Sequence, residues 1–214
     1  MDYFGFKLIY IPNNIIKIQI IFKLLLPYLN MGLDRLIHAR RSVRKFKSDK
    51  PDWRTIIECI DSARYSPMAG NNYSLKFILV DDKEKIQKLA EAAQQDFIAE
   101  VQYVVVVCTT PGRTEIAYGD RGKNYLKQQA GAAIQNFLLR LTEEGLATCW
   151  IGHFVDNEVK EVLNIPKDIQ VEAMFPIGYS YRKPESKRII ELDNILYFNK
   201  YGNKKMKEPP KLSA

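Results

Sequence analysis

The chain has 214 residues, of which 46% are hydrophobic and 27% are charged, an ordinary composition for one globular domain with tails. Its net charge of +7 comes mainly from the ends: residues 1–30 carry +2 and residues 199–214 carry +4, which leaves +1 for residues 31–198. The near-neutral body favours solvated basic tails and no nucleic-acid partner; the alternative is a non-enzymatic protein whose basic tails bind nucleic acid or an anionic membrane surface.

The first thirty residues contain an apolar stretch, IIKIQIIFKLLLPYL at 15–29, that is short for a membrane span and interrupted by Lys17 and Lys23. A central lysine costs a spanning helix about 2.5–3.5 kcal/mol. Because no small-residue cleavage site follows, a signal peptide is not favoured either. We therefore expect no stable membrane insertion. Residues 1–30 are interpreted as an N-terminal extension, either upstream of a natural start at Met31 or a dispensable appendage.

Hydrophobic periodicity and turn residues predict the elements of the body in chain order. They are helices at 32–41 and about 52–64, a loop at 66–72, a strand at 76–80, a helix over 86–97, a strand at 103–109, a mobile loop at 110–123, a helix at 124–144, strands at 147–151 and 171–178 with a short helix at 159–163 between them, and an irregular basic stretch at 181–214. This order is not a strict alternation of strand and helix, so the fold class is predicted as α+β, with a central sheet between helices.

The helix predicted at 124–144 stands out because its middle, AGAAIQNFLL, is apolar on nearly every side. Such a helix is expected to be buried all round, and Gly145 is a suitable residue to end it.

Familiar catalytic patterns are missing from the chain. There is no G-x-G-x-x-G after a strand, no P-loop and no G-x-S-x-G, and the only histidines are His38 and His153. The three cysteines, Cys59, Cys108 and Cys149, are odd in number and widely spaced in apolar runs, which predicts buried thiols in a cytoplasmic protein and no metal site. We therefore predict no catalytic side chain and expect a cofactor to supply the reactivity.

The strongest local feature is the run Arg40-Arg41-Ser42-Val43-Arg44. Guanidinium groups bind phosphate bidentately, and alternate side chains of an extended segment can face one ligand. The alternative is a solvated helix end, since cations are favourable near a helix C-terminus.

Two further features permit close approach of a flat ligand. The loop from Ser66 to Asn72 combines Pro, Gly and two Asn, although it could also be a plain turn. Small residues at Gly131-Ala132-Ala133, together with Trp150-Ile151-Gly152 at a strand end, suit a planar ring or the ordinary packing of another helix.

Together these segments resemble the nitroreductase-like flavoprotein family from about Gly32 to Gly202. The matching segments, in order, are RRSVRKF with the RRS-x-R opening, ARYSPMAGNN with the A-P-S-x-x-N loop, YLKQQAGAAIQNFLL with the core helix, EGLATCWIGHF with the G-L-G-x-C-W-I-G strand, and FPIGYSYRKPESKR with the P-x-G-Y stretch that leads to a basic pair. The resemblance implies a three-layer α/β/α sandwich with a mixed central sheet and a buried dimer-interface helix. The FMN-binding domain would span residues 31–202, followed by a basic tail at 203–214.

The resemblance also implies a role for each candidate site residue. Arg40, Arg41, Ser42 and Arg44 would hold the phosphate, ribityl chain and pyrimidine edge of FMN, and Lys187 or Arg188 would reach the phosphate from the far end of the domain. The flavin would be lined from the partner subunit by Pro67, Met68, Ala69 and Asn71, and its ring would be flanked by Trp150, Ile151 and Gly152.

The activity implied is that of an FMN-dependent NAD(P)H oxidoreductase, a homodimer in which hydride passes by a ping-pong mechanism from NAD(P)H through FMN to a small-molecule acceptor such as a nitroaromatic or a quinone. The alternative within the fold is a flavoprotein that performs reductive dehalogenation or biosynthetic ring oxidation.

The chain departs from the family pattern at two places. Tyr73-Ser74-Leu75 stands where Gln-Pro-Trp is frequent, and Met68 stands where Ser is common. We expect these changes to affect flavin contacts or the pocket wall. The substrate entrance is expected to be shaped by residues of the 110–125 segment, namely Arg113, Tyr118, Asp120, Arg121 and Tyr125.

Overall fold

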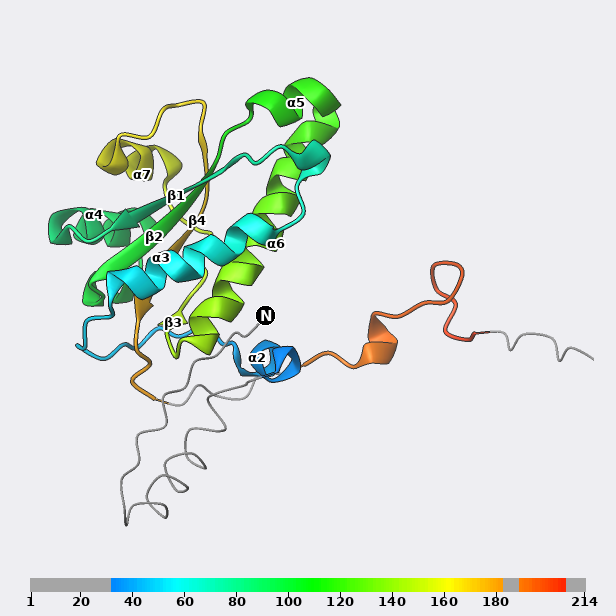
Figure 1. The fold of residues 1–214 in the computed structure, drawn as a ribbon, viewed down its shortest axis with the longest axis horizontal. Helices are drawn as coiled ribbons and strands as arrows, with labels where there is room; N and C mark the ends of the chain where they lie inside the picture. The colour runs from blue at the N-terminus through cyan, green and yellow to red at the C-terminus, as the bar shows by residue number, and fades with distance from the viewer. Residues whose placement is uncertain (1–31, 183–188, 207–214) are drawn as a thin grey trace, which may run out of the picture. The chain divides into compact units, whose positions relative to one another are not determined.

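In the computed structural model, which describes residues 32–182 and 189–206, a four-stranded sheet lies between two layers of helices (Figure 1). The strands are β1 (Leu75–Val80), β2 (Tyr103–Thr109), β3 (Ala147–Thr148) and β4 (Gln170–Gly178). Their order in the sheet is β1-β2-β4-β3, so the second and fourth strands form its centre. The α+β class and the nitroreductase-like fold predicted from the sequence are confirmed.

All pairings among these four strands are antiparallel, whereas a mixed sheet was expected. Among the described residues, parallel pairing is limited to a single bridge between Ser42 and Thr148. The connection from β1 to β2 explains the direction: Val80 pairs with Val104, so the helix and return segment between the strands bring the chain back to the end of the sheet that it left.

The β2 strand is buried at all seven positions and separates two hydrophobic clusters. Val104 and Val106 belong to one cluster, with helices α4 (Lys83–Ala93) and α7 (Asp156–Leu163). Val105 and Val107 belong to the other, with helices α3 (Trp53–Asp61) and α6 (Asp120–Glu143). Because successive side chains of a strand point to opposite faces, one strand supplies both cores of a three-layer sandwich.

The other helical segments are short. They are α2 (Leu33–Ala39), α5 (Gly112–Tyr118) and the 3-10 turns η1 (Ser62–Tyr65), η2 (Ala69–Asn71), η3 (Asp96–Glu100) and η4 (Leu192–Asn194). The prediction of a mobile loop at 110–123 was wrong, because this segment forms α5 and the start of α6. Gly119, with φ 54°, lies between the two helices and lets the chain turn there. This glycine therefore marks a boundary between helices and not a loop.

Within one chain, α6 is buried along one face only, not all round. The buried residues repeat at helical spacing: Gly122, Leu126, Gln129, Ala130, Ala133, Ile134, Phe137, Leu138 and Leu141. Gln135 is exposed on another side, and a Cβ atom added at Gly131 would meet no heavy atom within 4 Å. Gly131, one of the small residues in the apolar run AGAAIQNFLL, therefore faces open space within one chain.

Gly122 is needed for the close contact between α5 and α6. A Cβ atom at this position would lie 2.6 Å from Glu115 Cα and 2.8 Å from Thr114 O, both backbone atoms of α5. We expect Gly122→Ala to lower the free energy of unfolding by about 1–3 kcal/mol, because the two helices must move apart. Urea denaturation measures this. Gly32→Ala is the matched control, since its added Cβ meets no described atom within 4 Å and its cost is limited to the poorer N-cap that alanine makes, about 0.5–1 kcal/mol.

The three cysteines are free and buried, as predicted. Burial raises the pKa of Cys59 to about 12 and that of Cys108 to about 11, from an ordinary value of 9.0. The folded protein therefore keeps protons that the unfolded chain releases above pH 9. The stability that these thiols confer is complete below pH 9 and is lost as the pH rises from there towards 11–12, on the order of 1 kcal/mol per thiol per pH unit.

This predicts a lower urea midpoint at pH 10 than at pH 8. The Cys59→Ala/Cys108→Ala variant is the control, and its midpoint should depend less steeply on pH over this range. Equal slopes for the variant and the wild type would contradict the assignment.

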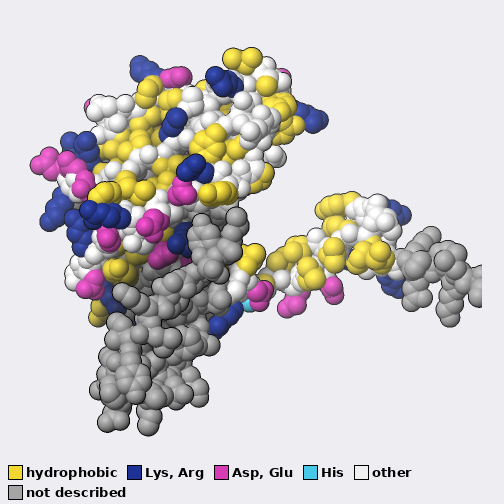
Figure 2. Space-filling view, in the orientation of Figure 1, with side chains coloured by type: hydrophobic (Ala, Val, Ile, Leu, Met, Phe, Trp, Pro, Cys, Tyr) yellow, Lys and Arg dark blue, Asp and Glu magenta, His cyan; other side chains and the backbone are white. Residues whose placement is uncertain are grey.

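No helix within residues 32–182 and 189–206 is long and apolar enough to cross a membrane. The chain divides into two units, the first ending at Lys183 and the second beginning at Pro184. The described residues of the second unit are largely irregular, as predicted. Hydrophobic side chains cover much of their visible surface (Figure 2). Ile189, Leu192 and Ile195 are each at least 60% exposed.

Candidate functional site

The basic run is extended after the end of helix α2. Alternate side chains of the run can face one ligand only in such a conformation. Arg40 caps the helix, and its N–H still donates to Leu36 O at 3.0 Å. Ser42 then forms the parallel bridge with Thr148, and Val43 N donates to Thr148 O at 2.9 Å. Val43 is buried while Ser42 and Arg44 are exposed, so these two side chains alternate with one that anchors the segment in the core.

The surroundings of Cys149 show which side chains of the run come together. Burial raises the pKa of the Cys149 thiol, whereas the positive charges of Arg44 and Arg40 and a hydrogen bond with Ser42 act in the opposite direction. Two cationic groups and a hydroxyl group therefore lie near one side chain at the edge of the sheet. Arg41 is directed differently, because its guanidinium donates to the carbonyl oxygens of His38 and Arg40 at the end of α2.

Thr148 adds a polar group that the sequence reasoning did not identify. It is 6% exposed, and its Oγ1 atom has no hydrogen-bond partner among the residues that the structure describes. A buried hydroxyl group without a partner costs about 1–3 kcal/mol, so a polar ligand atom reaching this point would be favoured. Its position in the predicted strand ATCWI, two residues before Trp150, could have identified it.

Trp150, Ile151 and Gly152 continue from β3 along the same edge. Trp150 is 42% exposed, and its ring meets that of Phe175 in an edge-to-face arrangement with centroids 5.6 Å apart. Ile151 is buried and exchanges two backbone hydrogen bonds of 3.0 Å with Met174. The hydrogen bonds of Ile151 and the contact with Phe175 thus position Trp150, while part of its ring remains open to a ligand.

The loop residues Pro67, Met68 and Ala69 lie elsewhere, in the wall of a mostly apolar groove of about 480 Å³. The other lining residues come from α5 and α6, and they are Tyr118, Tyr125, Gln128, Gln129 and Ala132. The two tyrosine rings meet edge to face with centroids 5.2 Å apart.

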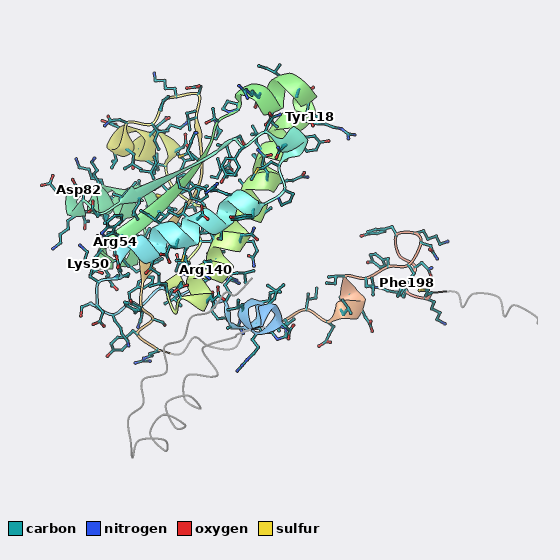
Figure 3. All side chains as sticks on the ribbon, in the orientation of Figure 1. Lys50, Arg54, Asp82, Tyr118, Arg140 and Phe198 are labelled. Atoms are coloured by element: carbon teal, nitrogen blue, oxygen red, sulfur yellow. The ribbon has the colours of Figure 1, made fainter. Side chains whose placement is uncertain are left out.

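A tight turn forms the tip of this loop. Gly70 and Asn71 have φ values of 56° and 55°, and a Cβ atom at Gly70 would lie 2.7 Å from the hydroxyl oxygen of Tyr118, which Figure 3 shows at the end of α5. Both the backbone conformation and the available space therefore require glycine at position 70. Of the residues expected to shape a substrate entrance, Tyr118 and Tyr125 line the groove, whereas Arg113, Asp120 and Arg121 are exposed outside its lining.

One chain does not bring all predicted site residues together. The Arg40–Arg44 segment and Trp150 meet beside β3, which follows the C-terminal end of α6. The loop at Ala69 is bonded to Gln129, fourteen residues before the end of that helix at Glu143. This separation corresponds to about 21 Å along the helix axis. Lys187 and Arg188 lie outside the described residues.

This chain aligns with most of the length of two archaeal proteins. A protein of Methanocaldococcus jannaschii that carries the name nitroreductase is 41% identical over 180 residues, which cover 68% of this chain and 90% of that protein. A protein of Archaeoglobus fulgidus named for NADH dehydrogenase and NAD(P)H nitroreductase is 28% identical over 150 residues, covering 68% and 83%.

Solved structures agree with the fold. A nitroreductase family protein from Clostridium novyi NT is 27% identical, with a TM-score of 0.66 over 81% of this chain and 96% of that one. An FMN-dependent nitroreductase from Clostridium difficile, at 23% identity, has a TM-score of 0.67 over 78% and 98%. The sequence profile of the nitroreductase family matches residues 37–179, which include the basic run, the loop, α6 and the Trp150 edge. With this match over two thirds of its length and the geometry described above, the chain belongs to the nitroreductase family of oxidoreductases.

Proposed function

We propose that this protein is an FMN-dependent NAD(P)H oxidoreductase that works as a homodimer. The observation that carries the proposal is the cluster at the Ser42–Thr148 bridge. Arg40 and Arg44 place positive charge near Cys149 there, and the buried hydroxyl group of the adjacent Thr148 has no partner among the described residues. The names of the C. difficile and A. fulgidus proteins, which mention FMN and NAD(P)H, support it.

The residues of this cluster fit the chemistry of FMN. Arginine is suited to a phosphate dianion, and Ser42 and Thr148 offer hydroxyl groups that suit a ribityl chain. The partly open ring of Trp150 provides a surface for a flat heterocycle. When bound, FMN supplies hydride transfer through its N5 atom. The protein's own residues then have to bind, orient and shield the reactants.

The loop groove suggests that a second copy completes the site. Pro67, Met68, Ala69 and Asn71 are expected to contact the same flavin as Arg40 and Arg44, yet they lie about 21 Å along α6 from the helix end next to that cluster. A second chain packed along the open side of α6 would supply them. Gly131, whose added Cβ would meet nothing, permits such an approach. Within this arrangement the tyrosine-lined groove would receive the nicotinamide and then the acceptor, a nitroaromatic or a quinone.

An absorbance spectrum tests the proposal directly. The purified protein, or the apoprotein incubated with FMN, should be yellow and should lose its visible absorbance when NADH or NADPH is added without oxygen. Protein that is colourless and cannot be loaded with FMN would overturn the proposal. Protein that binds FMN but does not oxidise NAD(P)H would favour the dehalogenating or ring-oxidising alternative.

A further inference from the structure

Two side-chain amides on α6 hold the loop that forms the groove wall. Gln129 and Asn136 are seven residues apart, so they lie two turns from each other on similar sides of the helix. Gln129 is only 4% exposed, although glutamine is ordinarily a surface residue. Their partners all belong to the segment between the end of α3 and the start of β1.

The contacts fix this segment at its beginning, middle and end. Asn136 Nδ2 donates to Ser66 Oγ at 2.9 Å. Gln129 Oε1 accepts a hydrogen bond of 3.1 Å from Ala69 N, and Gln129 Nε2 donates to Ser74 Oγ. Ser66 and Ser74 are each 7% exposed, so these bonds satisfy polar groups that water does not readily reach.

The loop needs this support because its backbone conformation is unusual. Gly70 and Asn71 are consecutive residues with positive φ, a region that few residues other than glycine adopt, and the loop carries no strand pairing. A carboxamide is neutral at every ordinary pH, and it can accept from Ala69 N and donate to Ser74 Oγ at once. Ser74, one of the departures from the family pattern, is thus part of the support.

We propose that Gln129 is a positioning residue, which with Asn136 holds Pro67–Asn71 in the shape that contacts FMN in the partner's half of the site. The inference rests on the proposed function. It predicts that loss of the Gln129 hydrogen bonds loosens the loop and weakens FMN binding while the fold remains.

The first test is Gln129→Met, which keeps the side-chain volume and removes both hydrogen bonds. Hydrogen–deuterium exchange of the apoprotein should become faster in peptides covering 66–74. The dissociation constant of FMN, measured by quenching of flavin fluorescence, should rise roughly 3- to 30-fold. Gln87→Met is the matched control, because Gln87 is exposed on α4 and its side chain donates to Glu91 in its own helix.

Gln129→Glu separates this role from general packing. At pH 8 a carboxylate can accept from Ala69 N but cannot donate to Ser74, whereas a protonated carboxyl can do both. The FMN affinity of Gln129→Glu, relative to the wild type at the same pH, should therefore recover as the pH falls. Gln129→Met, which can make neither hydrogen bond at any pH, should show no such recovery.

The outcomes are distinct. Wild-type FMN affinity and unchanged exchange in Gln129→Met would overturn the role of Gln129 and leave the proposed function intact. If the wild type takes up no FMN, the proposed function fails, and the exchange rates of 66–74 alone decide whether Gln129 fixes the loop. Should Gln129→Met not fold, Ser74→Ala removes the same hydrogen bond from the loop side and must give the same faster exchange.

Discussion

Replacement of both Arg40 and Arg44 by alanine is expected to raise the dissociation constant of FMN about 100-fold or more. A hydrogen bond to a charged group contributes about 1.5–3 kcal/mol, so two lost guanidinium contacts to a phosphate correspond to at least two orders of magnitude. Each single variant should lose about tenfold or more. Both residues follow the end of α2 and Arg44 is exposed, so the fold and the dimer should persist.

Flavin content after dialysis and fluorescence titration of the apoprotein measure this effect, and raised ionic strength should weaken the wild type more than the double variant. Arg54→Ala is the matched control. Arg54 is exposed on α3, where its guanidinium packs over Trp53 and pairs with Asp52 at 3.7 Å, so its removal should leave FMN affinity unchanged. Full flavin retention by the double variant would show that the phosphate binds elsewhere.

The parts of the fold that could be read from the sequence depend on local patterns. The β2 strand was predicted with its observed bounds, because a run of β-branched residues fits a strand that is covered on both faces. The basic run could bind a ligand only if the chain became extended after the helix, and the bridge between Ser42 and Thr148 meets this condition.

Features that depend on contacts between distant residues could not be read in this way. Helix α5 packs closely against Gly122 of α6, a contact that local sequence does not reveal, and the Pro and Gly residues around its start look like loop residues in isolation. Thr148 became a candidate only when its pairing with Ser42 was known, and Gln129 only when its bonds to a loop 55–60 residues earlier were known. Likewise, the helices that pack against α6 decide which of its sides is open within one chain. The hydrophobicity of the α6 sequence alone does not predict that side.

A charge placed on the open side of α6 is expected to separate the subunits. In Gly131→Arg, the new Cβ meets no atom of the described residues within 4 Å, and arginine favours a helix more than glycine does, so a single chain should fold normally. Between two α6 helices the guanidinium would be buried without a partner, which costs several kcal/mol. We expect the dimer dissociation constant to rise about 100-fold or more, with species near 24.8 kDa in sedimentation velocity.

The same variant should also lose FMN, although Gly131 belongs to neither the Arg40–Arg44 cluster nor the lining of the groove. Gln87→Arg on α4, which packs on the other side of the sheet, introduces the same charge and should leave both mass and flavin content unchanged. A Gly131→Arg protein that remains dimeric, or a wild type that sediments as a monomer, would contradict the proposed interface.

Mixed dimers show whether each site takes residues from two chains. The Arg40→Ala/Arg44→Ala chain lacks the phosphate-binding half, and Gly70→Val should disrupt the loop half, because Val strongly disfavours the φ of 56° found there. Each variant alone has two defective sites per dimer. A dimer with one chain of each kind has one site in which both halves are intact, so mixing the two proteins under conditions that exchange subunits should restore up to one FMN per mixed dimer. If each site were built within a single chain, every site in the mixture would keep a defect, and no binding would return.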